Sequence, residues 1–105
     1  MTYLDAISVF DHIRQNTVDP AVKHRWLLDI EKELFGIDEQ RAITEPVALP
    51  ETPSVYIYTL IYSYALYEGA VNEYEQIKEL SVKEKSAAKS IFRRKSRPKK
   101  MRFKG

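Results

Sequence analysis

The most constraining feature of this 105-residue chain is residues 55–67, a window that would be apolar around nearly its whole circumference as a helix. The window reads VYIYTLIYSYALY, and only Thr59 and Ser63 interrupt it with small polar side chains. Tyrosine, valine and isoleucine also suit a strand, but the apolar positions keep a three-four spacing for about five turns, which favours a helix. A helix that is apolar on nearly every side must be covered on nearly every side.

So short a chain has room for one core and little structure to wrap such a helix. We therefore predict that part of the helix meets another chain, where tyrosine can bury its ring and still satisfy its hydroxyl. The alternative is that it forms the central core helix of a monomer. The predicted oligomer interface comprises Tyr56, Tyr58, Ile61, Tyr62, Tyr64 and Tyr67.

Two shorter helices are predicted before this window. The first spans residues 3–15. The second spans residues 20–35, because an aspartate-proline pair is a start signal and Gly36 can terminate the helix in a left-handed conformation. Residues 37–53 contain three prolines and predict a long irregular connection, which is a weak sign of an assembly contact.

The tyrosine-rich window is predicted to open one long C-terminal helix. This helix starts after Ser54, which can cap it, and extends to about Arg94. Ser81 and Glu84 form a capping-box pattern, so the alternative is a break near Leu80 followed by a restart.

The charge distribution along the chain is strongly uneven. Residues 1–92 hold all 15 acidic side chains and nine basic ones, a net charge of −6, whereas the last 13 residues hold eight basic side chains and no acidic one. Such a block is typical of a solvated interaction tail. We predict that it neutralises nucleic-acid phosphates or folds onto an acidic protein surface; a merely solvated tail is the third alternative. The residues predicted to make this contact are Arg93, Arg94, Lys95, Arg97, Lys99, Lys100, Arg102, Phe103 and Lys104.

Together these patterns predict an all-α fold. A small helical bundle over residues 1–94 carries an extended basic arm over residues 95–105. The apolar window is well short of the roughly 20 residues that cross a bilayer, and no basic region precedes an apolar stretch at the N-terminus. We expect a protein made in a cytosol, without a membrane span.

The sequence offers little for catalysis. It has no cysteine, so disulfides and thiolate metal sites are excluded, and its three glycines form no phosphate-binding loop. His12 and His24 lack the spacing of metal ligands. Glu31 and Glu33 are two residues apart, do not share a helical face and are expected to be solvated. We expect no enzyme activity, no cofactor and no metal.

Three segments in this order resemble small tailed-bacteriophage proteins of the head-tail adaptor (connector) group. They are RWLLDIE at residues 25–31, YIY at residues 56–58, and EGAVNEY at residues 68–74. The resemblance covers most of residues 3–92 and rests on pattern, length and aromatic positions. The arm from Arg93 onward departs from it.

The resemblance implies an all-helical protein that forms a ring, commonly a dodecamer, below the portal in the virion neck. Such a ring extends the DNA channel and provides the platform for the stopper or tail. In these adaptors the C-terminal segment docks on the portal, which implies that the arm from Arg93 to Lys104 contacts the portal or the DNA in the channel. The alternative function is a small nucleic-acid-binding accessory protein that uses the same arm.

Overall fold

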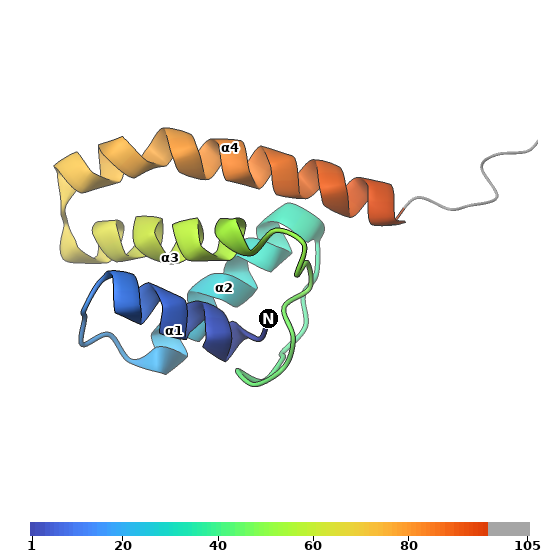
Figure 1. The fold of residues 1–105 in the computed structure, drawn as a ribbon, viewed down its shortest axis with the longest axis horizontal. Coiled ribbons are helices and arrows are strands. Elements are labelled where there is room, and N and C mark those ends of the chain that lie inside the picture. Colours follow the sequence, from blue (N-terminus) through green and yellow to red (C-terminus); the bar gives the residue numbers. More distant parts are fainter. Residues whose placement is uncertain (97–105) are drawn as a thin grey trace, which may run out of the picture.

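A computed structural model describes residues 1–96, apart from the side chains of residues 71, 73, 74 and 96. Within this range the chain forms four helices: α1 (Tyr3–Ile13), α2 (Pro20–Phe35), α3 (Pro53–Glu68) and α4 (Val71–Ser96). Helix α3 lies in the middle, with α4 running back along one side and α1 and α2 on the other (Figure 1). The predicted all-α fold is confirmed. No helix in the described range is long and apolar enough to cross a bilayer.

Local signals set the ends of the first two helices. The Thr2 hydroxyl accepts a hydrogen bond from the Asp5 N–H at 3.0 Å, and the Asp5 carboxylate accepts one from the Thr2 N–H at 2.9 Å, a reciprocal capping box. Asp19 caps α2, and Gly36 ends it with a φ of 70°. The predicted bounds of α2 are therefore confirmed, while α1 ends at Ile13, slightly before its predicted end.

The tyrosine-rich helix and the C-terminal helix are two elements. Helix α3 stops where Gly69 adopts a φ of 71°, a left-handed conformation that glycine takes without steric cost. The Ala70 N–H then donates to the Ala65 carbonyl at 2.9 Å and closes the turn. The long C-terminal helix is confirmed, but it begins at Val71 rather than after Ser54.

Of the two alternatives near Leu80, the structure shows the uninterrupted helix: α4 continues through Leu80, and Ser81 is 2 % exposed on its buried side. The predicted cap of the tyrosine-rich helix is wrong. Thr52, not Ser54, occupies the cap position of α3. The Ser54 hydroxyl instead donates a hydrogen bond to the Glu84 carboxylate of α4, which ties the start of α3 to the middle of α4.

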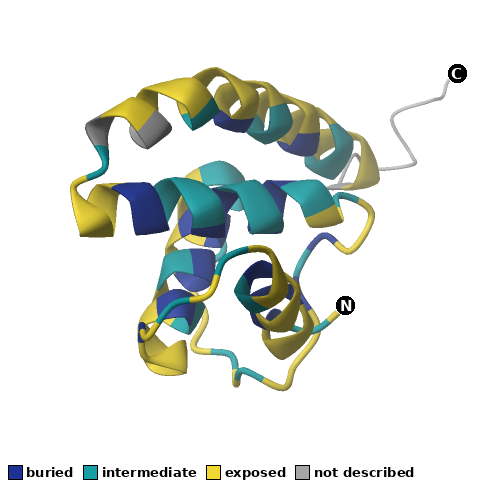
Figure 2. Ribbon diagram, turned by 60° about the vertical axis from the view of Figure 1, so that its left-hand side comes forward, coloured by how far each residue is buried: buried dark blue, intermediate teal, exposed yellow. Residues whose placement is uncertain are grey.

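The chain's own helices cover α3 on nearly every side, as its apolar circumference requires. Tyr56 and Leu60 are fully buried, and the ring of Tyr64 meets that of Phe10 in α1 at 5.8 Å. Ala88 of α4 is fully buried, and such a small side chain allows close approach to the bulky helix α3. Figure 2 shows buried and intermediate residues along α3 and exposed ones along the outer side of α4. Helix α4 thus supplies cover that we expected from another chain.

The irregular segment between α2 and α3 is fixed to the rest of the fold. It runs beside the start of α1, where the Leu4 N–H donates to the Ile43 carbonyl at 2.9 Å and the Val47 N–H donates to the Met1 carbonyl at 3.0 Å. Val47 and Leu49 are buried. Pro46 and Pro50 therefore belong to an ordered strap across the bundle, while Pro53 is the first residue of α3.

Candidate functional site

Glu31 is buried, so its expected solvation is wrong. It is 1 % exposed. Its carboxyl group accepts hydrogen bonds from the Tyr3 hydroxyl at 2.5 Å, the Tyr56 hydroxyl at 2.7 Å and the Ala48 N–H at 2.8 Å. The Tyr56 hydroxyl also accepts from the Leu49 N–H at 3.1 Å. This cluster, the Glu31 network, joins α1, α2, α3 and the irregular segment at one point.

The two tyrosines of the Glu31 network keep their protons. Burial, followed by the hydrogen bond to Glu31 and its charge, raises the pKa of Tyr3 and of Tyr56 well above the ordinary value for tyrosine. The hydroxyls therefore act as fixed donors, and the network holds the fold in place.

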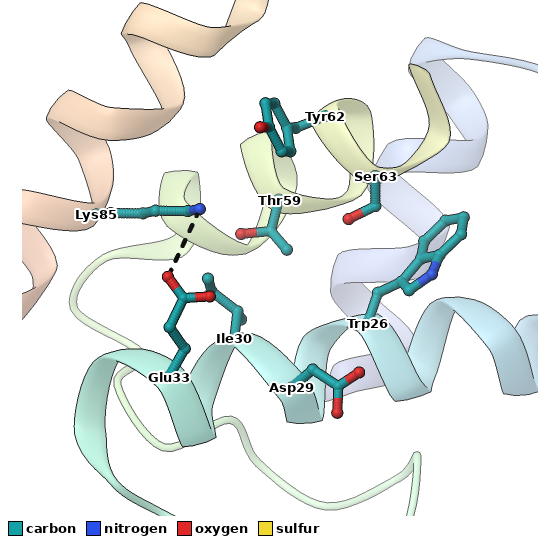
Figure 3. Close-up of a pocket in the computed structure, with 8 residues that line it drawn as sticks. All are labelled: Trp26, Asp29, Ile30, Glu33, Thr59, Tyr62, Ser63 and Lys85. Atoms are coloured by element: carbon teal, nitrogen blue, oxygen red, sulfur yellow. Dashed lines mark ion pairs between the residues drawn. The ribbon is translucent and has the colours of Figure 1, made fainter. Parts of the chain in front are cut away.

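The opposite face of α2 is open and forms a groove with α3 and α4. A pocket of about 190 Å³ lies between the three helices. Figure 3 shows how its lining side chains converge from them. The Lys85 ammonium of α4 lies 3.9 Å from the Glu33 carboxylate and 5.3 Å from the centre of the Tyr62 ring. The residues that line the pocket are Trp26, Asp29, Ile30, Glu33, Thr59, Tyr62, Ser63 and Lys85.

An aromatic rim extends this pocket toward the C-terminal end of α3. Trp26 and Ser63 also line a shallower depression with Leu66 and Tyr67. The ring of Tyr67 meets that of Trp26 edge to face at 6.0 Å, and Leu66 and Tyr67 are 54 % and 62 % exposed. We call the combined surface the α2–α3 groove. It is defined by Trp26, Asp29, Glu33, Ser63, Leu66 and Tyr67.

The five tyrosines and one isoleucine predicted for an oligomer interface have different environments. Tyr56 and Tyr64 are buried inside the chain, so they have no surface to offer a partner. Tyr58, Ile61 and Tyr62 are partly buried, and Tyr67 is exposed. Tyr62 and Tyr67 lie along one opening of the bundle, and Trp26 lines both of the depressions to which they belong.

Comparisons with protein-family models, curated proteins and solved structures find no match to this chain.

Exposed apolar side chains on two other helices were not predicted. Val9 and Ile13 are 43 % and 59 % exposed on α1, and Leu80 and Val82 are 45 % and 57 % exposed on α4. They lie on the two helices that flank α3 on opposite sides (Figure 1). Their signal in the sequence was weak, because each looks like one more core position of an amphipathic helix.

Part of the predicted basic contact is described by the structure. Arg93, Arg94 and Lys95 are exposed in the last turn of α4, so the helix includes residues that we assigned to the arm. The Lys95 ammonium lies 2.8 Å from the Glu51 carboxylate, and this hydrogen bond holds the pKa of Glu51 below its ordinary value. The other predicted contact residues lie outside the described residues: Arg97, Lys99, Lys100, Arg102, Phe103 and Lys104.

Residues 1–96 show no cluster of three or more acidic or histidine side chains that could hold a metal ion. His12 is exposed, and His24 packs its ring 5.2 Å from the ring of Tyr3. The described surface presents an acidic and aromatic groove, exposed aliphatic side chains and a cationic helix end.

Proposed function

We propose that this chain is a head-tail adaptor of a tailed bacteriophage. In this proposal it is a structural virion protein that forms a ring between the portal and the stopper or tail and extends the DNA channel. One observation carries the proposal: two of the segments on which the resemblance rests meet in the fold. Glu31, at the end of the first segment, accepts a hydrogen bond from Tyr56, at the start of the second, inside the buried network.

The exposed apolar side chains support ring formation. A closed ring of identical subunits joins two different surfaces of each subunit. Val9 and Ile13, at i and i+4 on α1, share one exposed face, and Leu80 and Val82 are exposed to either side of the buried Ser81 on α4, the helix on the other side of α3. The tyrosine-rich helix would then serve as the rigid centre of each subunit.

The cationic end of α4 supports a contact with the portal or with DNA. Arg93 and Arg94 are exposed and extend the charged segment that continues beyond Ser96. An acidic body with a cationic end is attracted to an anionic surface through that end. The range of this attraction shortens as the salt concentration rises.

Sedimentation of the full chain with the portal protein encoded by the same genome tests the proposal. We expect the chain to sediment with portal rings and to add a layer below them in negative-stain images. A variant with Arg93, Arg94 and Lys95 changed to Glu should lose this binding. The matched control changes Arg25, Lys83 and Lys89 to Glu, the same change in charge at exposed positions elsewhere. Failure of the unchanged chain to bind portal would overturn the proposal.

The same cationic end favours a second candidate, a nucleic-acid-binding accessory protein. This function predicts binding to double-stranded DNA without portal, with an affinity that falls steeply as salt rises. Deletion of residues 93–105 should abolish it. Portal binding that persists at a salt concentration where DNA binding is lost would decide for the adaptor.

A further inference from the structure

We propose that the C-terminal arm of one copy of this chain, residues 97–105, docks into the α2–α3 groove of a neighbouring copy. The proposal names an occupant for this open surface, which Trp26 and Tyr67 line. It rests on the self-association that the proposed function requires, but not on the portal. A chain that exchanges arms with its neighbours links the subunits of a ring without enlarging the interface between their helices.

The groove and the arm have complementary charges. The groove carries two carboxylates, Asp29 and Glu33, which follow one another at i and i+4 and so lie on one face of α2. The arm, RPKKMRFKG, carries five cations and no acidic side chain. Pairs of a guanidinium with a carboxylate form two parallel hydrogen bonds and are favoured at protein contacts.

The carboxylates of the groove have capacity for further partners. Within residues 1–96, Glu33 has one ion pair, to Lys85 at 3.9 Å, which is longer than a direct hydrogen bond. Its side chain is 64 % exposed. Asp29 is exposed and forms no ion pair or hydrogen bond with another described residue. The face of α2 therefore presents negative charge that the described part of the chain leaves largely unneutralised.

The apolar parts also match. Trp26, Leu66 and Tyr67 form an open rim beside the two carboxylates. The arm has two apolar side chains, Met101 and Phe103, at alternate positions, so an extended arm directs both, together with Lys99, to the same side. Methionine and phenylalanine pack well on aromatic rings, and cations favour the faces of tryptophan and tyrosine.

The direction of α4 favours a neighbour's groove over the chain's own. Helix α4 ends beside the start of α3, where Lys95 pairs with Glu51, whereas the aromatic rim lies at the other end of α3. The two ends of α3, a helix of 16 residues, are separated by about 24 Å, at 1.5 Å per residue. To place Phe103 on its own rim, the arm would have to reverse direction after Ser96 and run almost fully extended, at about 3.4 Å per residue. A second copy removes the need for this reversal.

Disulfide trapping between full-length chains tests the proposal, because the natural sequence has no cysteine. One chain carries Lys104→Cys, which leaves Met101 and Phe103 in place. The other carries Ser63→Cys, a small change at a residue that lines both parts of the groove. After mixing and mild oxidation, mass spectrometry counts the peptides that link positions 63 and 104.

The matched control replaces Ser63→Cys by Ser8→Cys, a more exposed serine on helix α1. Docking raises the local concentration of the two thiols, so we expect the link to position 63 to form about tenfold faster than the link to position 8. Equal rates would overturn the proposal. So would a chain carrying both Lys104→Cys and Ser63→Cys that forms only the link within itself, since the arm would then occupy its own groove.

Charge reversal separates docking from random collision. Asp29→Lys with Glu33→Lys should reduce trapping at position 63 to the level of the position 8 control. Glu75→Lys with Glu79→Lys changes the same charge at the same spacing on exposed positions of α4 and should leave trapping unchanged. An equal loss of trapping in both double variants would show that only the net charge of the chain matters and would overturn the proposal. Circular dichroism verifies that each variant is folded. Because no portal is present, a negative result here is distinct from a failure to bind portal.

Discussion

The two faces of α2 carry the same kinds of side chain and use them in opposite ways. On the inner face, Lys23 and Glu31 are 2 % and 1 % exposed, and each has polar partners within 3.0 Å. On the outer face, Asp29 and Glu33 are exposed and border the α2–α3 groove. Glu31 and Glu33 are only two residues apart. The comparison teaches that the burial of a carboxylate, and not its presence in the sequence, decides whether it holds the fold or meets a partner.

The strongest test of this comparison removes the inner carboxylate. Glu31→Ala leaves two buried tyrosine hydroxyls and the partly buried Ala48 N–H without an acceptor, which should lower the free energy of unfolding by about 4 kcal/mol. Glu31→Gln retains one acceptor oxygen and should lose about half as much. Urea unfolding followed by circular dichroism measures both. A loss below that of an ordinary surface substitution would mean that the network does not hold the fold.

A smaller loss of stability is expected when the Tyr56 hydroxyl, which links the Glu31 network to the irregular segment, is removed. Tyr56→Phe removes one donor to Glu31 and leaves the Leu49 N–H without an acceptor, so the free energy of unfolding should fall by about 2 kcal/mol. Tyr67→Phe is the matched control on the outer side of α3, and it should change the stability by less than about 0.5 kcal/mol. Equal losses in the two variants would contradict the assignment of one tyrosine to the fold and the other to the surface.

The features that depend on neighbouring residues were predictable from the sequence. The bounds of α2 follow from Asp19 and Pro20 at its start and Gly36 at its end, all within one turn of the boundary. The turn at Gly69 has a local cause too, but Val71 continues the apolar spacing of the tyrosine window. We therefore predicted one helix where the chain forms a hairpin. Periodicity alone does not distinguish a helix that continues from one that restarts in the same register.

The features that depend on residues far apart in sequence were not predictable. The burial of Glu31 requires Tyr3 and Tyr56 to converge on it from two other helices. The α2–α3 groove combines Trp26 with Ser63 and Tyr67, and its acidic side becomes visible only when the orientation of α2 is known. The excess of apolar surface on α3 was predictable, but its principal cover, the hairpin partner α4, was not.

The inner face of α2 also has a pH-dependent contact, between Lys23 and Asp11. It should contribute less to the free energy of unfolding than the Glu31 network does. Partial burial alone would raise the pKa of Asp11, but hydrogen bonds from Lys23 at 2.7 Å and Asn16 at 2.9 Å hold it below its ordinary value of 3.8. A carboxyl group with a depressed pKa stabilises the fold above its ordinary pKa, and this contribution is lost as the pH falls through the folded-state pKa.

The expected contribution of Asp11 is about 1 kcal/mol, since its side chain is 42 % exposed. Unfolding of the wild type and of Asp11→Asn should therefore differ by this amount near neutral pH. The difference should disappear once the carboxyl group of the wild type is protonated in the folded state. A difference that is independent of pH would mean that shape, and not charge, makes this contact stabilising.

A substitution on the outer face of α2 should cause the smallest change in stability and the clearest change in the association between copies of the chain. Glu33→Ala removes an exposed carboxylate whose partner, Lys85, lies 3.9 Å away, so the free energy of unfolding should change by less than about 0.5 kcal/mol. If the groove holds a cationic segment, the same substitution slows trapping between positions 63 and 104, whereas Glu79→Ala on the outer side of α4 does not. A large loss of stability in Glu33→Ala would remove the distinction between the two faces. Unchanged stability together with unchanged trapping would leave the distinction between the two faces intact but would contradict docking of the arm, because Glu33 would then have only its long, exposed pair with Lys85 among the described residues.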